Sequence, residues 1–224
     1  MLGVATKLSQ ININELIELN RFISKNFSYH VIDAEINILT DEEILDNLKN
    51  AVLTVQSKRK DVFEILDIYS SYDFDVCIVL GNKYYLSDEE RKLSKFRILD
   101  VIEKCLNIFD KLWIGVEGVE DIVKDVVEEY NLIAFYLYGY NCEINSKKAI
   151  YLPFVSKINN SILKIMNSYL SRRKNYSGNW ERYILPLNNL ERIKDIKNKN
   201  DIIVGYPLSQ SIDEIIKFKS IFEG

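Results

Sequence analysis

Lys7 and Glu117 are the two residues of this sequence that are best placed to transfer a proton. Each stands near the end of a short apolar run, Lys7 in Gly3–Leu8 and Glu117 in Leu112–Gly118. An amine and a carboxylate that face one another can act as a general acid and a general base. The same pair can also be an ordinary ion pair at the edge of the fold, and this alternative stays open.

Polar residues near the ends of other apolar runs are candidates for holding a ligand. The residues predicted to bind a ligand or cofactor are Gln56, Asn82, Tyr138, Ser156, Gly205, Ser209 and Ser211. Together with Lys7, Asp33 and Glu117 they are expected to surround a small molecule.

A phosphate or another anion is expected near the turn Gly205–Ser211. This turn leads directly into a helical pattern, and the free backbone amides at a helix start attract anions. Ser211 and Glu214 compete for the same amides, and Asp213 repels an anion. The sequence contains neither a GxGxxG nor a Walker A pattern.

The histidine and cysteine content excludes several kinds of site. His30 is the only histidine, so a Ser–His triad and a His-rich zinc centre are not expected. It opens an apolar run, and a structural or surface role is predicted for it rather than a catalytic one. The three cysteines, Cys77, Cys105 and Cys142, lack the spacing of a zinc site, and the first two are predicted to be small core residues.

The candidate residues depend on a regular alternation of apolar runs and helical patterns. The runs are Gly3–Leu8, Tyr29–Glu35, Ala51–Ser57, Phe74–Gly81, Leu112–Gly118, Leu132–Gly139, Ala149–Val155 and Asp201–Tyr206. Their nearly continuous apolar character is typical of parallel strands that are covered on both faces. The sequence therefore predicts an α/β fold, a single compact (β/α)8 TIM-like barrel over residues 1–224, with ligands at the carboxyl ends of the strands.

The helical segments are expected to pack outside this barrel. Helices are predicted at Leu86–Phe109, Glu120–Tyr130 and Ser211–Phe222. The core face of the first is predicted from residues three and four apart: Leu93, Phe96, Leu99, Ile102, Leu106 and Phe109.

Two intervals break the regular alternation. Only Tyr140–Lys148 separates the sixth run from the seventh, which is too short for a normal crossover helix, so the barrel is expected to be irregular there. The interval between the seventh and eighth runs contains two helical patterns, Asn160–Lys174 and Asn188–Asn198.

The composition limits the kinds of partner that this protein is expected to bind. The 224 residues carry a net charge of −4, and the acidic balance argues against general nucleic-acid binding. No apolar run reaches the ~18 residues of a membrane span, and the first ten residues lack a leader pattern, so a cytoplasmic protein without a membrane partner is expected. A homo-oligomer is compatible with these features. Abundant Lys, Glu and Ile suggest a thermophilic source, although AT-rich genomes enrich some of the same residues.

The C-terminal third resembles a known family. The segment Lys147–Val155, two helical patterns, Asp201–Pro207 and a final helix with an acidic start are similar to the closing portion of luciferase-like proteins, over residues 147–222. That resemblance implies a barrel that binds FMN or a deazaflavin coenzyme and has oxidoreductase activity. The chain is shorter than members of that family and offers no histidine at its strand ends.

Three functions remain open from the sequence. The first is a small flavin- or deazaflavin-dependent oxidoreductase, as the resemblance implies. The second is a lyase or isomerase for a phosphate-bearing substrate that uses Lys7 and Glu117. The third is a non-catalytic barrel that serves as a binding or assembly module, because a fold alone does not decide a function.

Overall fold

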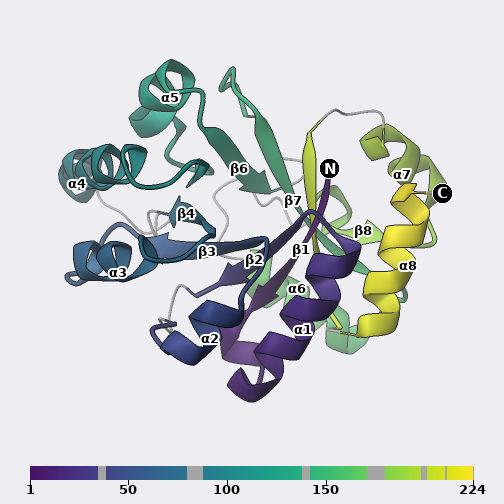
Figure 1. Cartoon of the computed structure of the whole chain (residues 1–224). Helices are drawn as coiled ribbons and strands as arrows, with labels where there is room; N and C mark the ends of the chain where they lie inside the picture. Colours follow the sequence, from purple (N-terminus) through teal and green to yellow (C-terminus); the bar gives the residue numbers. More distant parts are fainter. Residues whose placement is uncertain are drawn as a thin grey trace.

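Eight parallel strands close into a barrel in this computed structural model, which describes residues 1–34, 39–79, 88–137, 142–170, 180–197, 201–209 and 211–223. The barrel strands are β1 (Leu2–Lys7), β2 (Tyr29–Asp33), β3 (Ala51–Gln56), β4 (Asp75–Val79), β5 (Leu112–Gly115), β6 (Ile133–Leu137), β7 (Lys148–Val155) and β9 (Ile202–Pro207). Neighbouring strands pair in chain order, and β9 closes the circle by pairing with both β7 and β1 (Figure 1). The predicted (β/α)8 fold is confirmed, and each predicted apolar run overlaps one of these strands.

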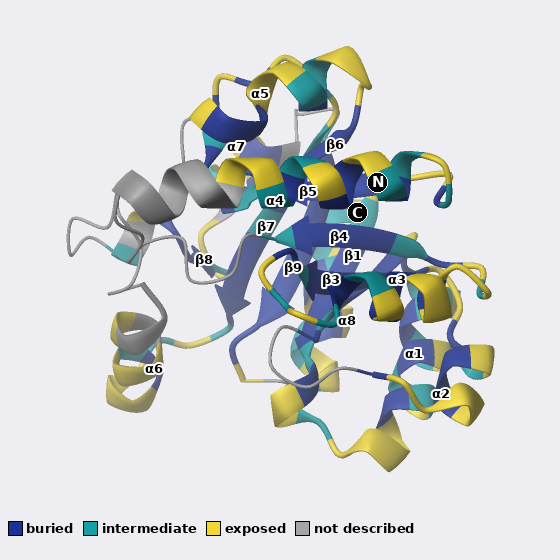
Figure 2. Ribbon diagram, turned by 90° about the vertical axis from the view of Figure 1, so that its left-hand side faces the viewer, coloured by how far each residue is buried: buried dark blue, intermediate teal, exposed yellow. Residues whose placement is uncertain are grey.

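Helices surround the barrel (Figure 1). They are α1 (Ile13–Asn26), α2 (Glu42–Asn47), α3 (Val62–Tyr69), α4 (Asp88–Leu106), α5 (Glu120–Glu129), α6 (Asn160–Leu170), α7 (Leu190–Lys197) and α8 (Ile212–Glu223). Figure 2 shows that the strands are buried whereas the helices expose their outward faces. Among the described helices, none is long and apolar enough to cross a membrane.

Side chains alternate between the inside and the outside of the barrel along each strand. The inside is filled by buried residues that include Ala5, Val31, Val52, Cys77, Trp113, Ile133, Ala149 and Val204. Their strand neighbours pack outward against the helices: Val4, Ile32, Leu53, Ile78, Ile114, Ala134, Ile150 and Ile203. Both faces of every strand are therefore apolar, which is why the runs in the sequence are continuous.

The connection between β6 and β7 lacks a helix in its described part, residues 142–147. Cys142 and Ile144 are buried there and join the outer apolar layer that helices provide elsewhere. The predicted irregularity at this place is confirmed.

A short strand that the sequence did not predict lies beside β7. Strand β8 (Leu185–Pro186) pairs in parallel with Phe154 and Val155. Strand β6 pairs with Lys148–Tyr151 at the beginning of β7, and β8 pairs near its end.

The buried face of α4 differs from the predicted one. Phe96 was placed on the core face, but 69% of its surface is exposed, so that prediction is wrong. Leu99 and Leu106 are half-buried at the margin. The fully buried residues of this helix are Ile98, Val101, Ile102 and Cys105. Apolar residues occur on two adjacent stripes of this helix, and spacing alone did not identify the stripe that faces the barrel.

This shifted face predicts unequal effects of truncation. Ile98→Ala is expected to lower the free energy of unfolding by ~2–5 kcal/mol because it opens a cavity in the core. Phe96→Ala should change it by less than ~0.5 kcal/mol, as is usual for an exposed position. Urea denaturation of both variants measures the difference. Equal losses, or a larger loss for Phe96→Ala, would contradict the observed face.

Candidate active site

Two charged side chains lie next to each other at the carboxyl mouth of the barrel. Lys7 ends β1, Asp33 ends β2, and the two residues are paired in register. Both are in step with inward-facing residues of their strands and therefore point into the mouth. Thr54 Oγ1 of β3 lies 3.4 Å from Asp33 Oδ1. Gln56, at the end of β3, faces the same way.

Glu117 lies at the same mouth, after the end of β5. The preceding residue, Val116, still follows β6, because its amide donates a hydrogen bond of 3.0 Å to the Phe135 carbonyl. Gly118 then turns the chain with a φ of 76°, and its amide donates to the Glu120 carboxylate. Only 6% of the surface of Glu117 is exposed, so its carboxylate is largely removed from bulk water.

Tyr206 of β9 forms an aromatic floor under the mouth. The Lys7 ammonium lies 5.8 Å from the centre of its ring, within the range of a cation–π interaction. The Tyr206 hydroxyl donates a hydrogen bond of 2.7 Å to Gln10 Oε1, in the turn that follows β1. The Tyr206 ring is only 4% exposed, so Lys7 and Gln10 are the groups that a ligand at this mouth would meet.

Below this floor the barrel is filled by stacked and edge-on aromatic rings. Tyr206 stacks on Tyr151, with 5.5 Å between the ring centres. Phe135 and then Trp113 follow edge-on, and Tyr29 ends the column near the amino ends of the strands. The interior is a packed core, as is usual for this fold, so a ligand binds on the mouth and not deep within the barrel.

The connection between β7 and β9 covers part of the carboxyl mouth. Ile162 of α6, Trp180 of the 3₁₀ helix η3 (Trp180–Arg182), and Tyr183 pack against the interior cluster. Figure 2 shows α6 to one side of the other helices. The cover lies over the β7–β9 side, while Lys7 and Asp33 stand on the strands β1 and β2.

The turn after β9 holds a carboxylate of the protein where an anion was expected. Glu214 Oε1 accepts a hydrogen bond of 2.9 Å from the Ser156 amide, and its other oxygen accepts from the Ser209 hydroxyl. The Ser211 amide donates to Ser209 Oγ at 3.3 Å. An external anion would have to displace Glu214 from these donors.

Gly205 has a packing role on the outside of the barrel. A Cβ atom at this position would lie 2.7 Å from the ring of Phe218 and 2.8 Å from that of Phe154. The glycine thus lets α8 approach β9 closely. Its missing side chain faces the helix layer and not the mouth.

The predicted site residues are therefore divided among three places. Lys7, Gln56 and Glu117 gather at the mouth. Ser156, Ser209 and Ser211 gather around Glu214, and Gly205 packs under α8. Asn82 and Tyr138 lie outside the described residues. Among the described residues, no group of three His, Cys, Asp or Glu side chains could hold a metal ion.

His30 has the structural role that its position predicted. Its Nε2 lies 2.8 Å from Thr6 Oγ1, and its Nδ1 lies 3.0 Å from Asn20 Nδ2. The same Asn20 side chain bonds both backbone groups of Lys49. Burial lowers the pKa of His30 from 6.5 to about 3, so the ring is neutral at physiological pH.

The cysteines are core residues. All three are buried, and none of them forms a disulfide bond. Burial raises the pKa of Cys105 to about 12 and also raises the pKa of Cys142. Neither thiol is activated as a nucleophile, since the reactive form of cysteine is the thiolate.

Residues 5–181 match the model of a protein family described as "Family of unknown function (DUF7388)". This chain belongs to the DUF7388 family. It is 52% identical over 225 residues to uncharacterized protein MJ1239 of Methanocaldococcus jannaschii, and the alignment covers 99% of both chains. No solved structure matches it. The part that matches the DUF7388 family includes Lys7, Asp33, Gln56 and Glu117, and it ends before the Gly205–Ser211 turn.

Proposed function

We propose that this protein is an enzyme that moves a proton on a small anionic substrate, as an isomerase or lyase does, at the carboxyl mouth of the barrel. The observation that supports this proposal is the placement of one lysine and two carboxylates, Lys7, Asp33 and Glu117, at that mouth. Barrels of this fold place their catalytic groups at the carboxyl ends of the strands.

Each residue has a distinct part in the proposed reaction. The Lys7 ammonium meets the negative charge of the substrate above the Tyr206 ring. The Glu117 carboxylate, largely shielded from water, takes the proton as a general base and returns it at a neighbouring atom. Asp33, which stands beside Lys7 in register, fixes the direction of the ammonium.

A flavin- or deazaflavin-dependent oxidoreductase is the second candidate. The order β7, α6, α7, β9, α8 favours it, because this order follows the resemblance to luciferase-like proteins. The turn after β9 fits the phosphate of FMN poorly, since Glu214 already holds the donors of Ser156 and Ser209. Blue-light absorbance of the purified protein, and its titration with FMN and with a deazaflavin coenzyme, test this candidate. A colourless protein that binds neither FMN nor a deazaflavin coenzyme would exclude it.

The first proposal predicts a ligand that depends on Lys7. A panel of small carboxylates and phosphate esters is screened by the rise in melting temperature that binding causes. At least one compound is expected to stabilise the wild-type protein, and Lys7→Met should abolish that effect because the cation of the mouth is lost.

The matched control is Lys58→Met. Lys58 is an exposed lysine just after β3, near the same end of the barrel, so its loss changes the net charge equally. This variant should bind as the wild type does. If no compound stabilises the protein, or if Lys7→Met binds normally, the enzyme proposal fails and a non-catalytic binding or assembly module is favoured.

A further inference from the structure

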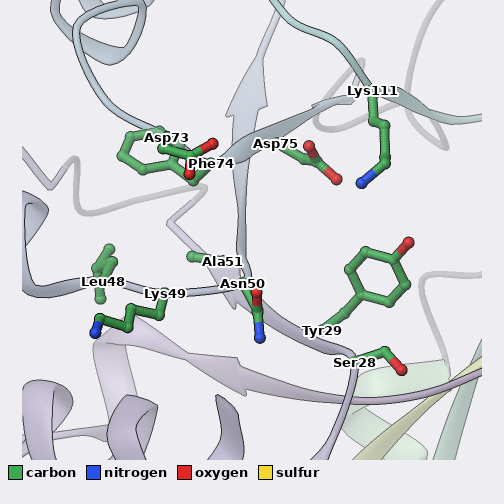
Figure 3. Close-up of a pocket in the computed structure, with 10 residues that line it drawn as sticks. All are labelled: Ser28, Tyr29, Leu48, Lys49, Asn50, Ala51, Asp73, Phe74, Asp75 and Lys111. Carbon is green, nitrogen blue, oxygen red and sulfur yellow. The ribbon is translucent and has the colours of Figure 1, made fainter.

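A second concave site lies at the opposite, amino-terminal mouth of the barrel. Its volume is about 460 Å³, which is within the range of small-molecule sites. It is lined by residues at or just before the starts of β2, β3, β4 and β5: Ser28, Tyr29, Leu48, Lys49, Asn50, Ala51, Asp73, Phe74, Asp75 and Lys111. Figure 3 shows these side chains around the pocket.

Opposite charges face each other across this pocket without touching. Asp75 at the start of β4 and Lys111 just before β5 point toward one another in Figure 3. Both residues lie in the described part of the chain, and no ion pair within 4.0 Å joins them there. Burial raises the pKa of Asp75 above its usual value, and Lys111, acting through space, partly offsets this rise.

The donors and rings around Asp75 also suit a ligand. The indole Nε1 of Trp113 is fully buried and makes no well-formed hydrogen bond, although it lies close enough to Asp75 to favour the ionised carboxylate. The ring of Tyr29 packs edge-on against Trp113. The Lys111 ammonium lies 6.0 Å from the centre of the Tyr29 ring. Phe74 also lines the pocket, but its ring packs against Tyr69 and Tyr72 in the outer layer.

Hydrogen bonds from Asn20 and His30 fix the part of the pocket wall that Lys49 and Asn50 form. The Lys49 amide donates to Asn20 Oδ1 at 2.9 Å, and the Lys49 carbonyl accepts from Asn20 Nδ2 at 3.1 Å. The Asn50 carbonyl accepts a hydrogen bond of 2.8 Å from the His30 amide. A pocket with a fixed wall loses little freedom when a ligand binds.

We propose that this mouth binds a small zwitterion, a free α-amino acid with an apolar side chain. The ammonium of the ligand lies at Asp75 and its carboxylate at Lys111, so that the ligand completes the charge pair that the protein leaves open. The apolar side chain lies against Tyr29. This site is separate from the carboxyl mouth, and the proposal does not rest on the enzyme function proposed above.

Calorimetric titration of the full chain with the twenty common L-amino acids tests the proposal. At least one apolar amino acid is expected to bind saturably. The matching amine without the carboxylate, and the matching acid without the ammonium, should each bind at least about tenfold more weakly, because each leaves one charge of the protein unpaired.

Two substitutions and one control locate the site. Asp75→Asn and Lys111→Met should each weaken the binding of that amino acid by about tenfold or more. Asp125→Asn removes an exposed carboxylate on α5 that does not line the pocket, and should leave the affinity within a few-fold of wild type. Melting temperatures close to wild type show that the variants are folded. The proposal is overturned if no amino acid binds, if both variants bind normally, or if the truncated compounds bind as well as the amino acid.

Discussion

Through His30, acidification is expected to destabilise this protein by up to about 1.4 kcal/mol for each pH unit as the pH falls from 6.5 toward the folded-state pKa of about 3. The folded state holds the ring fully buried and neutral, whereas the unfolded chain binds a proton with a pKa of 6.5. A pKa that is lower in the folded state means that the stability is fully present above pH 6.5 and is lost as the pH falls toward the folded pKa.

The contacts of the ring explain why it stays neutral. With the Asn20 amide donating to Nδ1, the proton is on Nε2 and is donated to the Thr6 hydroxyl. A second proton would have to be placed on Nδ1, where it would face the amide donor. The ring lies on the outer face of β2, where it is fully buried under the helix layer. A charge on the ring would therefore be poorly solvated.

Urea denaturation from pH 7.5 to pH 4 measures this effect in wild type and in His30→Leu. The variant is expected to be less stable at pH 7.5, by ~1–3 kcal/mol, since the Asn20 and Thr6 groups lose their partner. Its stability should then fall less steeply with pH than that of the wild type. Carboxylates contribute to acid unfolding in both proteins, so the comparison isolates His30. Parallel slopes would show that the ring takes up no proton on unfolding.

The Glu117→Gln variant is expected to lose ~10²–10⁴-fold of the proton-transfer rate while keeping substrate affinity within a few-fold. Glutamine preserves the size of the side chain and its buried position at the mouth but cannot accept a proton. The reaction is followed by NMR as exchange of a substrate C–H proton with D2O, using the compound whose binding depends on Lys7.

An exposed glutamate on the neighbouring helix provides the control. Glu129→Gln at the end of α5 makes the same chemical change away from the mouth and should leave the exchange rate unaltered. The assignment of Glu117 as the base fails if Glu117→Gln still catalyses exchange at the wild-type rate, or if its loss of rate is explained by a loss of binding alone.

The fold was largely predictable because burial on both sides makes barrel strands apolar along their whole length. Eight such runs, alternating with helical patterns, leave few other arrangements. The face of α4 was not predictable, since Phe96 satisfies the same spacing as the buried Ile102. The strand β8 has only two residues, which is too short for any periodic pattern.

The site was predictable only where it depends on strand ends. Lys7 and Glu117 were placed at the mouth by their position after apolar residues. The bond between Gln10 and Tyr206 spans 196 residues of sequence, and no local pattern reveals it. The sequence did not predict the amino-terminal pocket. Asp75 begins its strand and Lys111 precedes its strand, whereas ligand sites in this fold are expected at the carboxyl ends of the strands.

The two tryptophans of the chain give each mouth its own fluorophore. Trp113 lies in the barrel next to Asp75, close to the amino-terminal pocket. Trp180 belongs to the cover over the carboxyl mouth. Replacing either one with phenylalanine leaves a single emitter, so the emission wavelength and quenching of Trp113 and of Trp180 can be followed separately. Occupation of one mouth can thus be recorded optically without interference from the other.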